Sequence, residues 1–127
     1  MLTVRKAFSS FSVDDLDTAE TFYRDTLGLT VRRTPMGLEL DGTGGSAVFV
    51  YPKGADHSPA SFTILNLVVP DVGAAATELA DRGVPLLRYP EFDQDDDGIL
   101  RSTDPAQGPT IAWFADPAGN VLSLIEA

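Results

Sequence analysis

Few side chains in this sequence could carry proton-transfer chemistry. His57 is the only histidine, and the absence of cysteine excludes thiol chemistry and a disulfide framework. His57 lies in a polar loop beside Asp56 and Ser58, where a histidine is more often solvated than catalytic. Together with Tyr51 and Tyr89 it is still a candidate acid–base group, because imidazole and phenol can each transfer a proton.

An acidic turn, DQDDDG at 93–98, provides one candidate cation site. Three aspartates at alternate positions precede a glycine, as at the start of a calcium-binding loop, and Asp104 falls at the twelfth position. Arg101 at the ninth position and strand-like flanks in place of helices favour an ordinary acidic turn instead. Calcium binding by Asp93–Asp104 is left open. Arg101 either neutralises these aspartates or pairs with a carboxylate ligand.

These residues must be positioned by a strand–helix unit that occurs twice. Residues 8–29 contain a strand that alternates from Phe8, two aspartates (Asp14 and Asp15) that can cap a helix, an amphipathic helix and a glycine stop. Residues 62–84 repeat this order, with Asp71 as the cap and Gly83 as the stop. The repetition indicates a duplicated module rather than a long repeat array.

The other elements are predicted as strands between turn signals. The strands are expected at 29–34, 37–40, 47–51, 86–89, 99–102, 111–114 and 121–125. Asp41 to Gly45 and Asp116 to Asn120 are strong turn signals. A strand and a helix are therefore followed by further strands twice, which predicts an α+β fold with two helices.

Composition restricts the classes of partner. The chain has 127 residues, of which 43% are hydrophobic, and this suits one globular domain. A net charge of −10 argues against nucleic acid and against an anionic membrane surface, and it is compatible with a cationic ligand or simply with solubility. The sequence shows no signal peptide and no apolar run long enough to span a membrane, so a cytoplasmic location is expected.

Two segments resemble the vicinal oxygen chelate superfamily. They are SVDDLDTAETFYRDTLGL (Ser12 to Leu29) and WFADPAGNVLSLIE (Trp113 to Glu126). This superfamily includes glyoxalase I, extradiol dioxygenases, fosfomycin-resistance transferases and bleomycin-binding resistance proteins. The resemblance covers essentially the whole chain, residues 1–127 as a single domain. It implies two βαβββ modules, about 1–58 and 59–127, forming a curved mixed sheet around a cup with helices on the outer face. It also implies a homodimer.

The resemblance also implies where a metal would be held. Metal-using members take their ligands from three recurring places, which in this sequence hold Phe8, Ile64 and Ser123. Two of these side chains are apolar, and a neutral serine hydroxyl is a poor single donor to a divalent metal. We therefore expect neither a metal nor another cofactor.

The predicted cup carries apolar and aromatic side chains with a few polar groups, as small-molecule pockets usually do. The expected ligand-binding residues are Phe8, Ser10, Phe49, Tyr51, Ile64, Asn66, Tyr89, Arg101, Trp113 and Ser123. Trp113 is the best single candidate, since its flat ring can stack on an aromatic ligand. The alternative is that these side chains meet and fill the cup as core, although Ser10, Asn66 and Ser123 would be unfavourable in a closed apolar core.

The functional prediction is a metal-free small-molecule-binding protein of the bleomycin-resistance type, which sequesters a drug without chemistry. The ligand is hypothesised to be planar and aromatic or cationic. The alternative is a lyase, isomerase or dioxygenase of the same superfamily with an atypical active site. A third reading is a domain whose cup is only core and whose role is subunit association.

Overall fold

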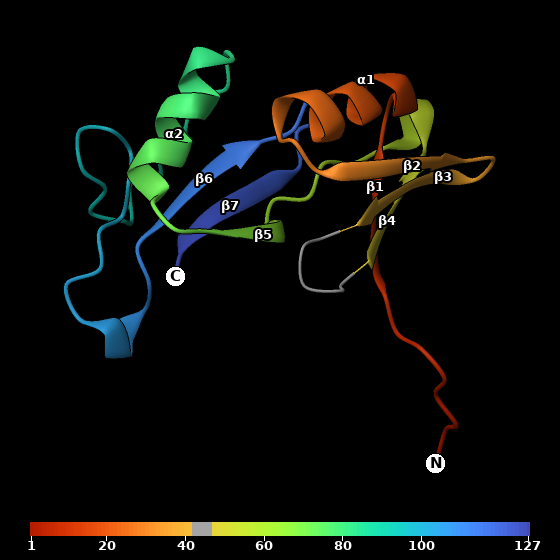
Figure 1. Cartoon of the computed structure of the whole chain (residues 1–127), viewed down its shortest axis with the longest axis horizontal. Helices are drawn as coiled ribbons and strands as arrows, with labels where there is room; N and C mark the ends of the chain where they lie inside the picture. The colour runs from red at the N-terminus through yellow and green to blue at the C-terminus, as the bar shows by residue number, and fades with distance from the viewer. Residues whose placement is uncertain (42–46) are drawn as a thin grey trace. The chain divides into compact units, whose positions relative to one another are not determined.

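The chain folds into two units, Met1–Pro59 and Ala60–Ala127. The computed structural model describes residues 1–41 and 47–127, so the predicted turn from Asp41 to Gly45 lies, after its first residue, outside the described residues. Each unit combines a mixed β-sheet with an α-helix, and this confirms the predicted α+β class (Figure 1). The curved cup that the resemblance implies stays a prediction.

The first unit has the predicted βαβββ order. Its elements are β1 (Ser9–Val13), α1 (Leu16–Thr21), the π-helix η1 (Phe22–Thr26), β2 (Thr30–Thr34), β3 (Gly37–Asp41), β4 (Ala47–Pro52) and a short 3-10 helix η2 (Gly54–Asp56). The strands lie in the order β1-β4-β3-β2. β1 pairs in parallel with β4, and the other neighbours are antiparallel.

The first helix begins where the sequence predicts and ends differently. Of the two aspartates predicted to cap it, Asp15 is the N-cap, and its carboxylate accepts a hydrogen bond from the Asp17 amide at 3.0 Å. After one and a half turns the helix widens into η1, in which the Leu27 amide donates to the Phe22 carbonyl at 3.0 Å. Phe22 and Tyr23 in this π-helix are buried, with their rings edge to face at 5.3 Å. Gly28 then takes the left-handed conformation, with φ of 75°.

The second unit repeats the strand order. Its elements are β5 (Thr63–Val69), α2 (Val72–Asp81), a 3-10 helix η3 (Pro105–Gln107), β6 (Ile111–Ala115) and β7 (Val121–Glu126). The sheet order is β5-β7-β6, so the first strand again lies in parallel beside the last. Asp71 caps α2 by accepting from the Ala74 amide at 3.0 Å, and Gly83 follows with φ of 81°.

Two predicted strands of the second unit, Leu86–Tyr89 and Ile99–Ser102, are wrong. Leu100 forms only an isolated bridge with Ile111, and the Leu87 amide donates to the Trp113 carbonyl at 2.7 Å. Both segments therefore share the edge of β6, where the first unit has one continuous strand, β2. Flanking prolines at 85 and 90 lack amide donors and limit how far the first segment can pair. The described residues contain seven strands.

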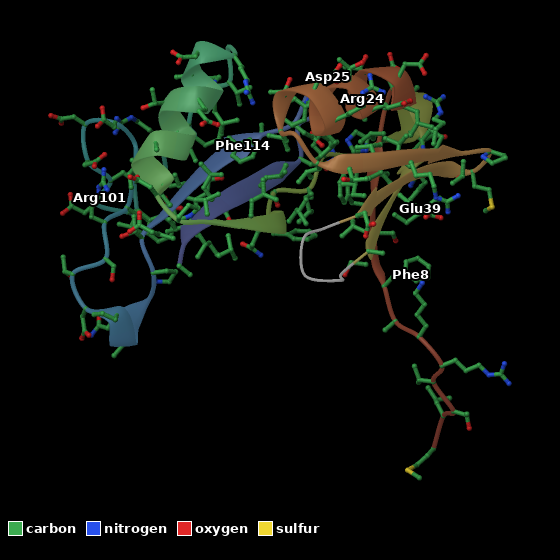
Figure 2. All side chains as sticks on the ribbon, viewed as in Figure 1. Phe8, Arg24, Asp25, Glu39, Arg101 and Phe114 are labelled. Carbon is green, nitrogen blue, oxygen red and sulfur yellow. The ribbon has the colours of Figure 1, made fainter. Side chains whose placement is uncertain are left out.

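The core of the second unit lies between α2 and one face of its sheet. Alternation along β6 and β7 places Ala112, Phe114, Leu122 and Leu124 on this face, and all four are buried. Val72 and Leu79 of α2 are buried as well, and Figure 2 labels Phe114 beside that helix. The opposite face of the sheet carries Trp113 and does not pack against α2. Neither α-helix of the described chain is long and apolar enough to cross a membrane.

Candidate ligand-binding site

Three of the predicted site residues form a row across the sheet of the second unit. Trp113 of β6 lies opposite Ser123 of β7, and Ser123 lies opposite Asn66 of β5. Paired residues point to the same side of a sheet, so this row lies on the face away from α2. The Ser123 hydroxyl is fully buried and donates to the Asn66 side-chain carbonyl at 2.6 Å. The polar groups are thereby satisfied without closing the face as an apolar core.

An aromatic cluster covers the Trp113 end of this row. The Phe92 ring stacks on Trp113 with centroids 5.1 Å apart and planes at 10°. Tyr89 meets Trp113 edge to face at 5.4 Å and 89°. Phe92 is 43% exposed, and Trp113 and Tyr89 are half-buried. Flat rings at the surface in mutually perpendicular and parallel orientations offer both stacking and edge contacts to a planar molecule.

One glutamine holds the loop that supplies Tyr89 and Phe92. The Gln94 side chain accepts from the Tyr89 amide at 2.7 Å and donates to the carbonyls of Leu87 and Gly98, at 2.9 and 2.7 Å. The loop borders a cavity of about 260 Å³ that is open to solvent, lined by Arg88, Tyr89, Pro90, Phe92 and Gln94. The site therefore combines aromatic faces, amide groups and a guanidinium.

Arg101, which was predicted as a site residue, pairs with Asp95 rather than with the aromatic cluster. Its guanidinium Nε donates to the Asp95 carboxylate at 3.1 Å, at the loop beside α2 (Figure 2). The Asp95 carboxylate also accepts from the amides of Ile99 and Asp97, at 2.9 and 3.0 Å. The hydrogen bond from the Ile99 amide, followed by those from Arg101 and the Asp97 amide, holds the pKa of Asp95 below its usual range, although partial desolvation acts in the opposite direction. The structure thus has Arg101 neutralising an aspartate of the acidic turn.

The acidic segment does not assemble a cation site from its ends. The Asp95 carboxylate accepts a hydrogen bond from the Asp97 amide within the turn. The Asp104 carboxylate caps η3 by accepting from the Ala106 amide at 3.0 Å. Within residues 1–41 and 47–127, no group of three or more histidine, cysteine, aspartate or glutamate side chains is placed to hold a metal ion. The match of 93–104 to a calcium loop is therefore explained by turn and cap chemistry.

The first unit brings together three further predicted residues. Ser10 of β1 lies opposite Phe49 of β4, and the Phe49 ring stacks loosely on Tyr51 with centroids 6.5 Å apart and planes at 14°. A Cβ atom on Gly37 would meet the Phe49 Cζ atom at 2.9 Å and would collide with the Val50 carbonyl oxygen. Glycine at 37 is what lets β3 approach this aromatic pair so closely.

His57 is held by a serine rather than left in solvent. The Ser12 hydroxyl and the His57 Nδ1 atom are 2.8 Å apart, and both residues are half-buried. Ser12 lies opposite Tyr51 in the β1–β4 pairing, so the three polar groups belong to one end of the sheet. Sequence spacing gives no signal for this contact, because the two residues are 45 positions apart.

Phe8 and Ile64 occupy two of the three positions from which metal-using members of the superfamily take their ligands. Neither residue lies at a regular position of a paired strand. The first strand begins at Ser9, one residue later than predicted, and Phe8 precedes it with 63% of its surface exposed (Figure 2). Ile64 sits where the β5–β7 register shifts. With the third place, Ser123, committed to Asn66, the residues at these places do not fit a divalent metal.

Comparison with known proteins places the chain in a family. A sequence profile of the Glyoxalase/Bleomycin resistance protein/Dioxygenase superfamily matches residues 7–124. No curated protein sequence matches. Among solved structures, TnmS3, an antibiotic binding protein from Streptomyces sp. CB03234, is 25% identical with a TM-score of 0.66, and the alignment covers 98% of both chains.

Two further solved structures share the fold. A glyoxalase/bleomycin resistance protein from the same Streptomyces strain is 26% identical with a TM-score of 0.63, over 94% of this chain and 100% of that one. Lactoylglutathione lyase from Agrobacterium tumefaciens is 19% identical with a TM-score of 0.62, over 98% and 96% of the two chains. The chain belongs to the Glyoxalase/Bleomycin resistance protein/Dioxygenase superfamily.

Proposed function

We propose that this chain binds a planar aromatic small molecule and sequesters it without chemical conversion. The observation that carries the proposal is the surface cluster in which Trp113 stacks on Phe92 and meets Tyr89 edge to face. Aromatic side chains that remain partly exposed contribute large contact area at low conformational cost. The adjoining cavity of about 260 Å³ gives the ligand a place beside these rings.

Charge favours a cationic ligand. The chain carries a net charge of −10, and a field of one sign raises the local concentration of ligands of the other sign. Two exposed carboxylates, Glu91 and Asp93, flank Phe92 in the sequence of the loop. Arg88 in the cavity lining opposes this preference locally, although its guanidinium is hydrogen-bonded to the carbonyls of Asp95 and Asp96. The proposed ligand is therefore a planar aromatic cation, with a hydrogen-bonding substituent for the Gln94 side of the site.

Two finer features belong to the same proposal. Binding is proposed to need no metal, because the three family metal places carry two hydrocarbon side chains and one hydroxyl that already donates to Asn66. The binding form is proposed to be a cytoplasmic homodimer with the cup that the family resemblance implies. The likeness to TnmS3, an antibiotic binding protein, supports a drug-like ligand at 25% identity.

A fluorescence titration tests this function directly. Trp113 is the only tryptophan, so its emission reports on one site. Titration with bleomycin and with ethidium, a planar cation, is expected to quench Trp113 emission to saturation, with a stoichiometric endpoint by calorimetry. Addition of a chelator should leave the curves unchanged. An absence of quenching and of heat with either compound would count against the proposal, and chelator-sensitive binding would count against its metal-free form.

A further inference from the structure

A second cavity, of about 220 Å³, lies between α2 and the segment that follows this helix (Figure 1). Four of its lining residues belong to α2 and four to residues 84–99, all within the second unit. None of them lines the cavity beside the aromatic cluster. An apolar cavity of about 150 Å³ can hold a benzene ring, so this separate space is large enough for a small organic molecule.

Small side chains along one stripe of α2 leave this space open. These residues are Gly73, Ala76, Thr77 and Ala80. Their spacing places them on one face of the helix. The larger residues Val72 and Leu79 are buried, on the side of α2 that packs on β6 and β7. Protein interiors pack closely where side chains are long enough to meet, so the small residues account for the gap on this other face.

Hydrogen bonds hold the opposite wall of the cavity in place. Val84, Leu86 and Ile99 supply its apolar side chains, and Ile99 is only 1% exposed. The Val84 amide donates to the Leu79 carbonyl at the end of α2, at 2.8 Å. The Ile99 amide donates to the Asp95 carboxylate at 2.9 Å. The wall is therefore formed before a ligand arrives, and this lowers the cost of ordering it on binding.

Two oxygen acceptors line the same cavity. Asp97 is exposed and is the only ionisable residue among the described residues that line it. It takes part in none of the salt bridges found within the described part of the chain. The Thr77 hydroxyl donates to the Gly73 carbonyl at 3.1 Å, and its oxygen can still accept from a further donor. A carboxylate and a hydroxyl beside an apolar space suit an ammonium group that carries a hydrocarbon chain.

We propose that this cavity binds a linear primary alkylammonium ion. The hydrocarbon chain lies between α2 and residues 84–99, and the ammonium group donates to the Asp97 carboxylate and the Thr77 hydroxyl. Burial of the chain against apolar side chains supplies most of the affinity, since an ion pair at an exposed carboxylate contributes little. This inference goes beyond the proposed function and does not depend on the aromatic site, so either proposal can fail without the other.

Charge selects a cation over an anion of the same length. The net charge of −10 raises the local concentration of cations, and the carboxylate of an alkanoate would be repelled by Asp97. A guanidinium, that of Arg101, does lie near Gly73, but its Nε atom already donates to Asp95 at 3.1 Å. The ion pair with Asp95 reduces the attraction of Arg101 for a second carboxylate.

Three probes with the same chain length test the site. Hexylammonium, hexan-1-ol and hexanoate are each titrated into isotope-labelled protein, and the amide NMR shifts are followed. Hexylammonium is expected to give saturable shifts centred on residues 73–80 and 97–99, with weaker binding of hexan-1-ol and the weakest binding of hexanoate. The proposal would be overturned by an absence of saturable shifts, by shifts centred on Tyr89, Phe92 and Trp113, or by hexanoate binding as tightly as hexylammonium.

Matched substitutions separate the role of charge from that of the cavity. Asp97→Asn is expected to weaken hexylammonium binding about threefold and to leave hexan-1-ol binding unchanged. Asp96→Asn, an exposed neighbour outside the lining, should change neither. An equal effect of the two aspartate substitutions on hexylammonium would overturn the assignment of the ammonium group to Asp97.

The cavity itself is tested by filling it. Ala80→Leu should weaken binding of hexylammonium and of hexan-1-ol at least about tenfold, because the longer side chain takes the space of the hydrocarbon chain. Ala74→Leu makes the same change at an exposed position of α2 outside the cavity and should leave both affinities unchanged. Undiminished binding of hexylammonium by Ala80→Leu would overturn the proposal.

Discussion

The ring of Phe92 lies on the ring of Trp113 with centroids 5.1 Å apart and planes inclined by only 10°. Phe92 thus covers one face of the tryptophan, and the separation leaves no room for a third ring between them. Phe92→Ala is expected to uncover that face and to raise the acrylamide quenching constant of Trp113 clearly. The loss of stability should be about 1 kcal/mol, the worth of one aromatic pair at a partly exposed site.

The control for this prediction is Glu78→Ala, an exposed change on α2, which packs on the other face of the same sheet, and it should not change Trp113 quenching. If Phe92→Ala leaves quenching unchanged, the stacking does not limit access to the tryptophan. Titration of the same variant with ethidium then separates two roles: tighter binding means that Phe92 competes with the ligand, and weaker binding means that Phe92 is part of its contact surface.

The hydrogen bond between Ser123 and Asn66 predicts an asymmetric pair of substitutions. Asn66→Ala leaves a fully buried serine hydroxyl without its acceptor, so the free energy of unfolding should fall by about 2 kcal/mol. Ser123→Ala leaves an exposed amide that water can satisfy, so the loss should be about 1 kcal/mol or less. Urea unfolding of both variants and the double variant measures the difference. Equal losses would mean that burial of the hydroxyl does not decide the cost.

Gly37 is predicted to be the least replaceable of the described glycines in the first unit. Gly37→Ala combines a φ of 156° with collisions against the Val50 carbonyl and the Phe49 ring, and should cost about 3 kcal/mol. Gly54→Ala is the matched control, because its φ of 54° is also left-handed but nothing lies within 4 Å of the new Cβ atom. That change should cost only about 1 kcal/mol. Thermal unfolding of the two variants should rank them in this order; the reverse order would contradict the close approach of β3 and β4.

Asp95 predicts a specific loss of stability in acid. Its pKa is lowered by the Ile99 amide, by Arg101 and by the Asp97 amide, so the folded form binds a proton less readily than the unfolded form. The contribution is therefore complete above the unfolded pKa and is lost as pH falls through the lower folded pKa. Urea midpoints between about pH 5 and about pH 2 should fall less steeply for Asp95→Asn than for the natural chain. Asp93→Asn, an exposed change in the same turn, serves as control and should keep the full slope.

Much of the fold could be predicted because its signals are local. The caps Asp15 and Asp71 bind amides within three positions, and Gly28 and Gly83 adopt positive φ directly after the helices. In the turn at 116–120, the Gly119 amide donates to the Asp116 carbonyl at 2.9 Å. Such contacts depend on a few neighbouring residues, so alternation and spacing were sufficient to place them.

The errors arose where distant segments decide the structure. Segments 86–89 and 99–102 have strand-like composition, but both meet the same edge of β6, and only one strand can pair fully there. Phe92 was missed as a site residue because a ring between Glu91 and Asp93 has no periodic partner in the sequence. The pairing of Ser12 with His57 depends on the β1–β4 alignment and leaves no trace in spacing.

Gln94 makes the segment from Arg88 to Gly98 a fixed loop whose exposed side chains can be substituted. Three hydrogen bonds from one side chain fix both ends of the loop, to Leu87 and Tyr89 on one side and to Gly98 on the other. Pro90, Glu91 and Phe92, between these anchors, are exposed, so their side chains can change without repacking the core under α2. A combinatorial library at positions 88, 90, 91 and 92 with Gln94 retained would therefore diversify recognition on a constant scaffold.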